Sequence, residues 1–300
     1  MPRDPKNILL NSYYIAGLTK DSIYLGNFTT PYKLLAIDYQ FQNSFTSTIN
    51  WSKNLKVSKG ATITVDSLFV YLRDGMEAIS YKTLLKNKNE IFIEKTLPFT
   101  AFANVGKQTA IYRSINLRKE NVLIVQHGEL KGVKSNPNLL QKQGDGIFST
   151  DGMLFPIPKS DKIVYMYHYR NQFLCIDTDL NKIYTGKTID TINHAHISVT
   201  SIKSDHSTTL SSPPLLVNRT GCSNGEYIFI NSALIANNEN HNLLNKAEII
   251  DVYQVENGKY KFSFYLPHFA GKKVNDFKVY GKNLVAIYDH YLMVYKLNFD

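Results

Sequence analysis

The chain has 300 residues, of which 43% are hydrophobic, and it carries a formal net charge of +9. Its 20 Tyr and 16 Phe residues suit the half-buried surface of a β-sheet, where an aromatic ring packs while a hydroxyl reaches water. No run approaches the roughly eighteen apolar residues of a transmembrane helix, so we expect no membrane span within these residues.

The positive charge comes from 34 Lys and Arg against 25 Asp and Glu. Such a surplus attracts anionic partners. The lysines are spread along the chain, however, and the densest stretch, KNLKVSK at 53–59, is short. Nucleic-acid modules concentrate their charge and carry recognisable motifs, which this sequence lacks, so we expect no nucleic-acid partner. Salt-sensitive binding of another anionic polymer through Lys53, Lys56 and Lys59 remains a separate hypothesis.

A series of similar units follows the first apolar run, NILL at 7–10. The first unit contains YIAGLTKDSIYLGNFTTPYKLLAIDY and the last contains NDFKVYGKNLVAIYDHYLMVYKL. Both predict strands, because short runs rich in Val, Ile, Tyr and Phe alternate with turn residues. Related patterns lie between them, and we place six units near residues 14–55, 60–95, 98–140, 145–190, 195–268 and 272–297.

Units of about fifty residues with four strands each are typical of β-propeller blades. We therefore predict an all-β fold, a single β-propeller domain over residues 1–300 with six blades of four antiparallel strands. Two stacked sandwiches are the alternative, but no Pro/Gly/Ser-rich linker separates two halves. Because the last unit holds only three strands, residues 7–10 are predicted to pair with 291–297 and to complete the final blade. Residues 192–217 are expected to form one strand and a long loop on the fifth blade.

Several segments resemble a family of uncharacterised exported β-propeller proteins of Gram-negative bacteria. They are GDGIFSTDGMLF, YMYHYRNQFLCID, GKTIDT and IIDVYQ followed by KYKFSFYLP, and the N-terminal NSYYIAGLTKDSIYLGNFTTPYKLLAIDY fits the same group. The similarity to TolB-like and quinoprotein-dehydrogenase-type propellers is one of blade pattern only. The resemblance implies a propeller in the cell envelope, periplasmic or anchored to a membrane through a segment absent from this chain. It implies no activity, and a cytoplasmic location stays open because the sequence has no signal peptide.

The candidate ligand-binding residues lie around the run YMYHYRN. Tyr165, Tyr167 and Tyr169 alternate and would share one face of a strand, where they either pack between blades or form a stacking wall for a sugar or another planar ligand. Arg170 and Asn171 follow at the strand end, where the mouth of the propeller channel would lie. Asp151, in the turn at 149–152, completes the candidate set of Tyr169, Arg170, Asn171 and Asp151.

The most metal-like feature is His194-Ala195-His196. In an extended segment residues i and i+2 point the same way, so both imidazoles would reach one divalent ion, and Asp190 and His206 could add ligands. The alternative is a solvated strand face without a metal. Asp177 and Asp179, by contrast, are interpreted as a turn, because the spacing lacks the Gly and the distal Glu of a calcium loop.

No motif for nucleophilic catalysis or phosphate binding is present. Whether Cys175 and Cys222 form a disulfide stays open. We therefore expect a non-enzymatic binding propeller of the cell envelope without a cofactor, whose partner is another envelope protein or a small ligand such as a saccharide. The alternative is an enzyme, a hydrolase, lyase or redox protein, with its site at the channel mouth and possible dependence on a divalent metal.

Overall fold

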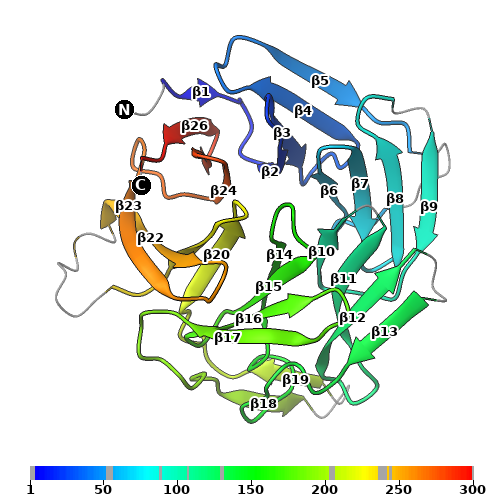
Figure 1. Ribbon diagram of the computed structural model, residues 1–300, viewed down its shortest axis with the longest axis vertical. Helices are drawn as coiled ribbons and strands as arrows, with labels where there is room; N and C mark the ends of the chain where they lie inside the picture. Colours follow the sequence, from blue (N-terminus) through cyan, green and yellow to red (C-terminus); the bar gives the residue numbers. More distant parts are fainter. Residues whose placement is uncertain are drawn as a thin grey trace. The chain divides into compact units, whose positions relative to one another are not determined.

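The computed structural model describes residues 4–51, 57–87, 90–106, 108–128, 132–202, 207–235, 242 and 245–298. These residues contain no α-helix. Their strands form six four-stranded antiparallel sheets, which follow one another along the chain as the blades of a β-propeller (Figure 1). The all-β, six-bladed fold predicted from the sequence is thereby confirmed.

Two compact units each contain three blades. The first unit comprises Met1–Pro98 and His268–Asp300, and the second comprises Phe99–Pro267. In the first unit, blade 1 consists of β2 (Tyr13–Leu18), β3 (Ser22–Asn27), β4 (Lys33–Asp38) and β5 (Ser44–Thr48), and blade 2 of β6 (Thr62–Val65), β7 (Phe69–Asp74), β8 (Ile79–Leu84) and β9 (Ile91–Lys95). Blade 6 consists of β24 (Asp276–Tyr280), β25 (Asn283–Tyr288), β26 (Tyr291–Lys296) and β1 (Lys6–Asn7).

The second unit is built from one continuous stretch of chain. Blade 3 consists of β10 (Ala101–Val105), β11 (Thr109–Ile115), β12 (Asn121–His127) and β13 (Val133–Asn136), and blade 4 of β14 (Gly152–Pro156), β15 (Lys162–Tyr167), β16 (Gln172–Asp177) and β17 (Lys182–Lys187). Blade 5 consists of β20 (Asn218–Ser223), β21 (Tyr227–Ser232), β22 (Ala247–Gln254) and β23 (Tyr260–Pro267).

Blade 6 takes its fourth strand from the beginning of the chain, as predicted. Lys6 lies opposite Leu292 and Asn7 opposite Tyr291, and the Ile8 N–H donates to the His290 carbonyl at 2.9 Å. The expected strand at 7–10 is nevertheless displaced. The Asn7 side chain accepts from the Leu9 N–H, and Leu9 has a φ of 69° and is 82% exposed, so the strand ends before the two leucines.

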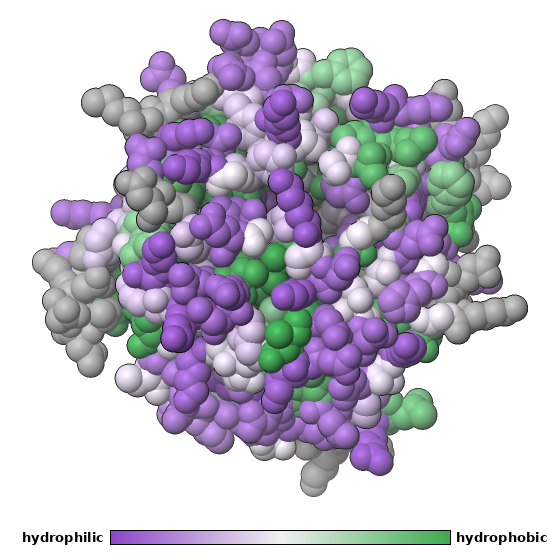
Figure 2. Space-filling view, in the orientation of Figure 1, coloured by the Kyte–Doolittle hydropathy of each residue, from purple (hydrophilic) through white to green (hydrophobic). Residues whose placement is uncertain are grey.

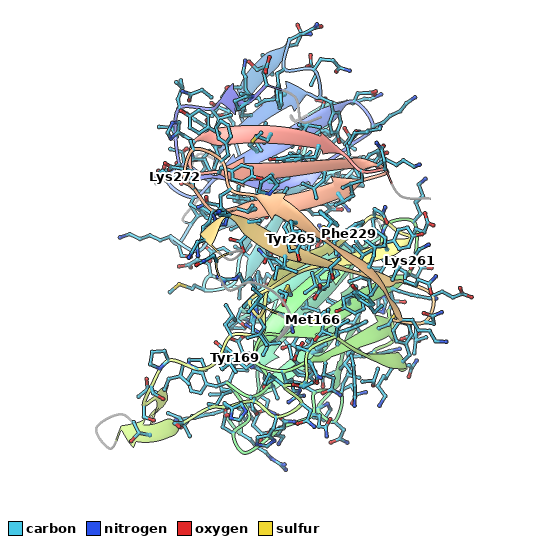
Figure 3. All side chains as sticks on the ribbon, turned by 90° about the vertical axis from the view of Figure 1, so that its left-hand side faces the viewer. Met166, Tyr169, Phe229, Lys261, Tyr265 and Lys272 are labelled. Atoms are coloured by element: carbon cyan, nitrogen blue, oxygen red, sulfur yellow. The ribbon has the colours of Figure 1, made fainter. Side chains whose placement is uncertain are left out.

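The segment before blade 5 also differs from the sequence expectation. Instead of one strand it forms two, β18 (Val199–Ile202) and β19 (Ser207–Leu210), which pair as a separate two-stranded sheet. Their Ser and Thr residues lack the apolar alternation that identifies the blade strands, although Thr favours extended structure. In Figure 3 this hairpin projects from the body of the second unit.

Apolar side chains fill the spaces between neighbouring blades within each unit. In the first unit one cluster joins blades 6 and 1 around Ile23 and Ile287, and another joins blades 1 and 2 around Ile63 and Leu72. In the second unit the clusters lie between blades 3 and 4 and between blades 4 and 5. A four-stranded sheet buries too little alone, so each blade depends on its neighbours for a core. On the face seen in Figure 2 hydrophilic residues predominate and apolar ones are interspersed, in keeping with the dispersed lysines.

Candidate functional site

A cluster of polar and aromatic side chains lies at one end of blade 4 and is called the Asp151 site here; it comprises Arg113, Asp151, Tyr165, His168 and Tyr169. Asp151 immediately precedes β14, while His168 and Tyr169 lie in the loop between β15 and β16. The His168 N–H donates to the Asp151 carbonyl at 3.0 Å, which brings the two loops together. Figure 3 shows Tyr169 at the end of the second unit from which the hairpin β18–β19 projects.

The start of β14 requires a residue without a side chain. A Cβ on Gly152 would lie 2.3 Å from the Met166 carbonyl oxygen, far inside van der Waals contact. Glycine at this position therefore lets β14 approach β15 closely. Just before Asp151, the Thr150 carbonyl accepts from the hydroxyl of the fully buried Tyr165.

An ion pair from two blades holds the Asp151 carboxylate. Arg113, on β11 of blade 3, donates through Nη1 to the Asp151 carboxylate and to the Gly152 carbonyl, the latter at 2.7 Å, and through Nε to Thr100 at 2.9 Å. The Arg113 side chain is 11% exposed and that of Asp151 is 31% exposed. Burial disfavours the charge on Arg113, but Tyr165 and Asp151 together raise the pKa of its guanidinium above the usual value. The site therefore presents a fixed, partly exposed carboxylate on a buried cation.

Tyr169 lies near this carboxylate, and the His168 ring lies next to Tyr169. Tyr169 is half-buried, and burial together with the nearby charge of Asp151 raises the pKa of its phenol, which stays neutral. The His168 ring lies 6.0 Å from the Tyr169 ring, centroid to centroid. His168 Nδ1 is 2.9 Å from the Asn218 carbonyl oxygen, and because a carbonyl only accepts, Nδ1 carries the proton. In a neutral His168, Nε2 is then left with its lone pair.

The loop that carries the two rings is firmly held. The Asn218 side-chain amide donates to the Tyr167 carbonyl at 2.8 Å and to the Arg170 carbonyl at 3.0 Å, and Asn218 itself is buried. The Val217 N–H donates to the His168 carbonyl at 2.8 Å. The first strand of blade 5 thus fixes the conformation of the site loop in blade 4, which reduces the entropy lost when a ligand binds.

Arg170 and Asn171 occupy different surroundings from Asp151 and Tyr169. The Arg170 side chain is fully buried and donates to the carbonyls of Ser149, at 3.1 Å, and Gln141, at 2.7 Å. Its guanidinium carbon lies 3.6 Å from the centre of the Tyr167 ring, and burial lowers its pKa. Asn171 donates from its side chain to the Asp190 carbonyl at 2.7 Å. Both residues therefore support neighbouring loops, and a ligand-binding role for them remains a prediction.

The alternating tyrosines divide between packing and the site. Tyr165 and Tyr167 are fully buried in the core between blades 3 and 4, with ring centroids 5.2 Å apart. On the opposite face of β15, Val164 and Met166 pack against blade 5. Packing between blades is thus correct for Tyr165 and Tyr167. Tyr169 lies beyond the strand end, and its ligand-binding role, like that of Asp151, remains a prediction.

The proposed metal ligands lie in an irregular loop. His194 and His196 are both exposed and neither belongs to a strand, while Ala195 between them is buried. The Asp190 carboxylate accepts from the Thr188 hydroxyl and from the Ile192 N–H. Within the described ranges, no three His, Cys, Asp or Glu side chains are grouped for a metal ion. His206 and the basic residues Lys53 and Lys56 lie outside those ranges, and the metal site remains a prediction.

Two further sequence interpretations have a structural outcome. Asp177 caps the turn between β16 and β17, accepting from the N–H groups of Asp179 and Asn181, as expected for a turn. Cys175 and Cys222 are both buried and are not joined in a disulfide.

Arg113 and His168 are the site residues that sequence reasoning missed. Arg113 interrupts the apolar run AIYRSI, and a lone Arg in such a strand is a signal for a buried partner. The partner, Asp151, lies 38 positions away on another blade, where no local pattern connects the two. His168 follows Tyr167, the last residue of β15, and its ring turns toward Asn218 of blade 5, the side on which Val164 and Met166 also pack.

None of the described residues belongs to a helix long and apolar enough to cross a bilayer. No family model matches the sequence, and no curated protein matches it. The fold does resemble solved structures. A member of the DUF4221 family from Bacteroides vulgatus aligns with a TM-score of 0.53 and 12% identity over 98% of this chain and 93% of that one. A catalytically inactive variant of virginiamycin B lyase from Staphylococcus aureus, solved with quinupristin, aligns with a TM-score of 0.51 and 10% identity over 98% and 99%. At such identities the resemblance establishes the β-propeller fold alone.

Proposed function

We propose that this protein is a non-enzymatic binding propeller of the bacterial cell envelope, and that the Asp151 site binds a small polar ligand of the saccharide class. The observation that carries the proposal is the partly exposed Asp151 carboxylate, which the buried Arg113 holds near Tyr169, with the His168 ring next to Tyr169. Small-molecule sites combine aromatic surface with a few precisely placed polar groups, and this cluster supplies both.

A saccharide suits this arrangement because its hydroxyls donate to a carboxylate while its C–H face packs on a ring. Arg113 already holds the Asp151 carboxylate in place, so ligand binding does not have to immobilise this side chain at a cost in entropy. Asn218 fixes the loop of the two rings in the same way. The envelope location is supported by the resemblance of the sequence to exported propellers, and fractionation of the source cells with an antibody to the protein tests it.

The binding test uses the purified protein on an array of mono- to tetrasaccharides, followed by calorimetric titration of each hit. Tyr169→Ala removes the ring and Asp151→Asn removes the carboxylate charge; each is expected to weaken binding at least about tenfold, about 1.4 kcal/mol. Tyr280→Ala, which truncates a half-exposed tyrosine of blade 6, is the matched control and should leave the affinity unchanged. Melting curves show whether each variant is folded. No hit on the array, or hits insensitive to both site variants, would refute the saccharide proposal.

An enzyme is the second candidate, and His168 favours it. With Nδ1 donating to the Asn218 carbonyl, Nε2 of a neutral ring is available as a general base next to Tyr169. Chromogenic esters and glycosides test for turnover, with His168→Ala as the variant expected to lose it while keeping the melting temperature. A metal-dependent form of the enzyme predicts a stoichiometric divalent ion, measured by elemental analysis, that His194→Ala removes.

A further inference from the structure

The fourth strand of blade 6 is much shorter than its counterparts. β1 contains two residues, whereas the outer strands of the other blades, β5, β9, β13, β17 and β23, contain between four and eight. β26 continues to Lys296, but β1 pairs only with Tyr291 and Leu292 at its beginning (Figure 1). In the described part of the chain, residues 293–296 therefore have no strand on their outer side.

The hydrogen bonds between β26 and β25 show which backbone groups of β26 are unpaired at its outer edge. The Leu297 N–H donates to the Lys282 carbonyl at 2.8 Å, which marks these two as a hydrogen-bonded pair of the antiparallel ladder with β25. Because such pairs alternate along a strand, the N–H and C=O groups of Val294 and Lys296 point to the outer edge. No described residue pairs with them, and unpaired edge groups of this kind are a template for a further strand.

The described residues before β1 do not extend it along this edge. Asp4 and Pro5 precede β1 and are exposed, and neither takes part in the sheet. The ring of Pro5 fixes its φ near about −65°, away from the value of about −140° typical of an antiparallel strand. Pro5 therefore explains why β1 begins no earlier than Lys6.

One face of the open edge is apolar. Val294 is buried in the cluster that joins blades 6 and 1, together with Ile8 and Leu292 from blade 6 and Ile37 and Tyr39 from blade 1. Side chains of an added strand would alternate between the two faces of the sheet, so every second residue would extend this cluster. An incoming segment with alternating apolar residues gains the most buried area.

The charges around the edge favour one kind of incoming strand over others. Lys296 is exposed at the end of β26 and Lys6 lies at the near end of the gap, against the exposed Asp4 just before β1, so these edge residues carry a net positive charge. Antiparallel pairing with a second copy would bring the Lys296 residues of two molecules together, and an edge lysine disfavours such self-pairing. We propose that the outer edge of β26 binds an extended acidic peptide of a partner protein, which completes the fourth strand of blade 6.

The test measures fluorescence anisotropy of the fluorescein-labelled peptide EVEVEVE against the full chain. It should bind saturably, while KVKVKVK and the proline-interrupted peptide EVPVPVE should not. Lys296→Pro removes the outward N–H at an exposed position without a packed side chain, and is expected to weaken binding at least tenfold. Lys296→Glu keeps the N–H but reverses the charge, and a smaller loss is expected.

Lys187→Pro is the matched control. Lys187 is also an exposed lysine at the end of an outer strand, and its N–H points outward because the next residue, Thr188, donates inward to Asn171. It should leave binding of EVEVEVE unchanged, and melting curves verify that both proline variants are folded. Absence of saturable binding overturns the proposal, as does equal loss in Lys187→Pro and Lys296→Pro. A dimer in sedimentation that Lys296→Pro dissolves also overturns it, in favour of a second copy as the occupant.

Discussion

Removal of the Asn218 side-chain amide should loosen the loop that carries Tyr169. In Asn218→Ala the backbone bonds of residue 218 remain, but the carbonyls of Tyr167 and Arg170 lose the donors that lie 2.8 and 3.0 Å away. Each hydrogen bond contributes about 0.5–1.5 kcal/mol net, and leaving a buried acceptor unpaired costs about 1–3 kcal/mol. We expect the free energy of unfolding of the second unit to fall by about 2–4 kcal/mol, against about 5–15 kcal/mol for a typical domain.

Hydrogen exchange measures this effect locally. The amides of Val217 and Asn218 both donate to the His168 carbonyl and report the opening of the loop. A loss of about 2–4 kcal/mol corresponds to exchange roughly 30-fold faster or more at these positions. The only Trp, Trp51, lies in the first unit, so its fluorescence should be unchanged, which provides an internal control. An increase below about threefold would contradict the reasoning.

Asn218→Asp separates the hydrogen bonds from the volume of the side chain. The new carboxylate has the same shape but faces two carbonyl oxygens, so burial and these oxygens would raise its pKa in the folded state. The variant should therefore be less stable than Asn218→Ala at pH 7 and should recover as the pH falls and the carboxyl gains a proton that it can donate. Equal destabilisation at pH 7 and pH 4 would show that the amide acts only by filling space.

Three further predictions concern single groups. Hydrogen bonds from Ser58 and from the following turn lower the pKa of Asp74, so the stability from its ionised form is present above about pH 4 and lost on further acidification. Asp74→Ala should therefore lower the free energy of unfolding by about 2–4 kcal/mol, measured by urea unfolding at pH 7, and its difference from the wild type should shrink in acid. Burial raises the pKa of Asp276, which accepts from the Ile15 N–H at 2.8 Å, so the ionised carboxylate is unfavourable at neutral pH. Asp276→Asn keeps an acceptor and should melt no lower than the wild type at pH 7. Any gain in melting temperature should disappear below about pH 4, where the carboxyl of the wild type is protonated. Burial also raises the pKa of the Cys175 thiol. A disulfide reagent at pH 8 should therefore label Cys175 only after denaturation. Rapid labelling of Cys175 in the native protein would contradict its burial.

The blades could be predicted because strand signals are local. Alternating Val, Ile, Tyr and Phe between turn residues identified the strands, and the three-stranded last unit identified the need for a strand from the beginning of the chain. The bounds of that strand were displaced because an Asx turn at Asn7 competes with the apolar run NILL. The hairpin β18–β19 was underestimated because Ser and Thr form it without apolar alternation.

The candidate site could be predicted only in part. Asp151 and Tyr169 come together because the loops before β14 and after β15 meet at the same end of blade 4, as antiparallel topology requires. Arg170 was expected at the mouth of the channel, as one of the groups that bind a ligand. Its burial depends on the carbonyls of Gln141 and Ser149, whose positions follow from the packing of a loop that has no regular structure.

The origin of blade 6 from both ends of the chain has a consequence for biosynthesis. The blades of the second unit are contiguous in sequence, so a nascent polypeptide contains all three of them before the ribosome reaches β24. The Ile15 amide, by contrast, can bond to Asp276 only after 261 further residues have been translated, and Lys6 pairs with Leu292, which is later still in the chain. Blades 1 and 2 are therefore synthesised before the second unit but acquire blade 6 only after it, so they would need the protection of a chaperone for longer than the blades of the second unit.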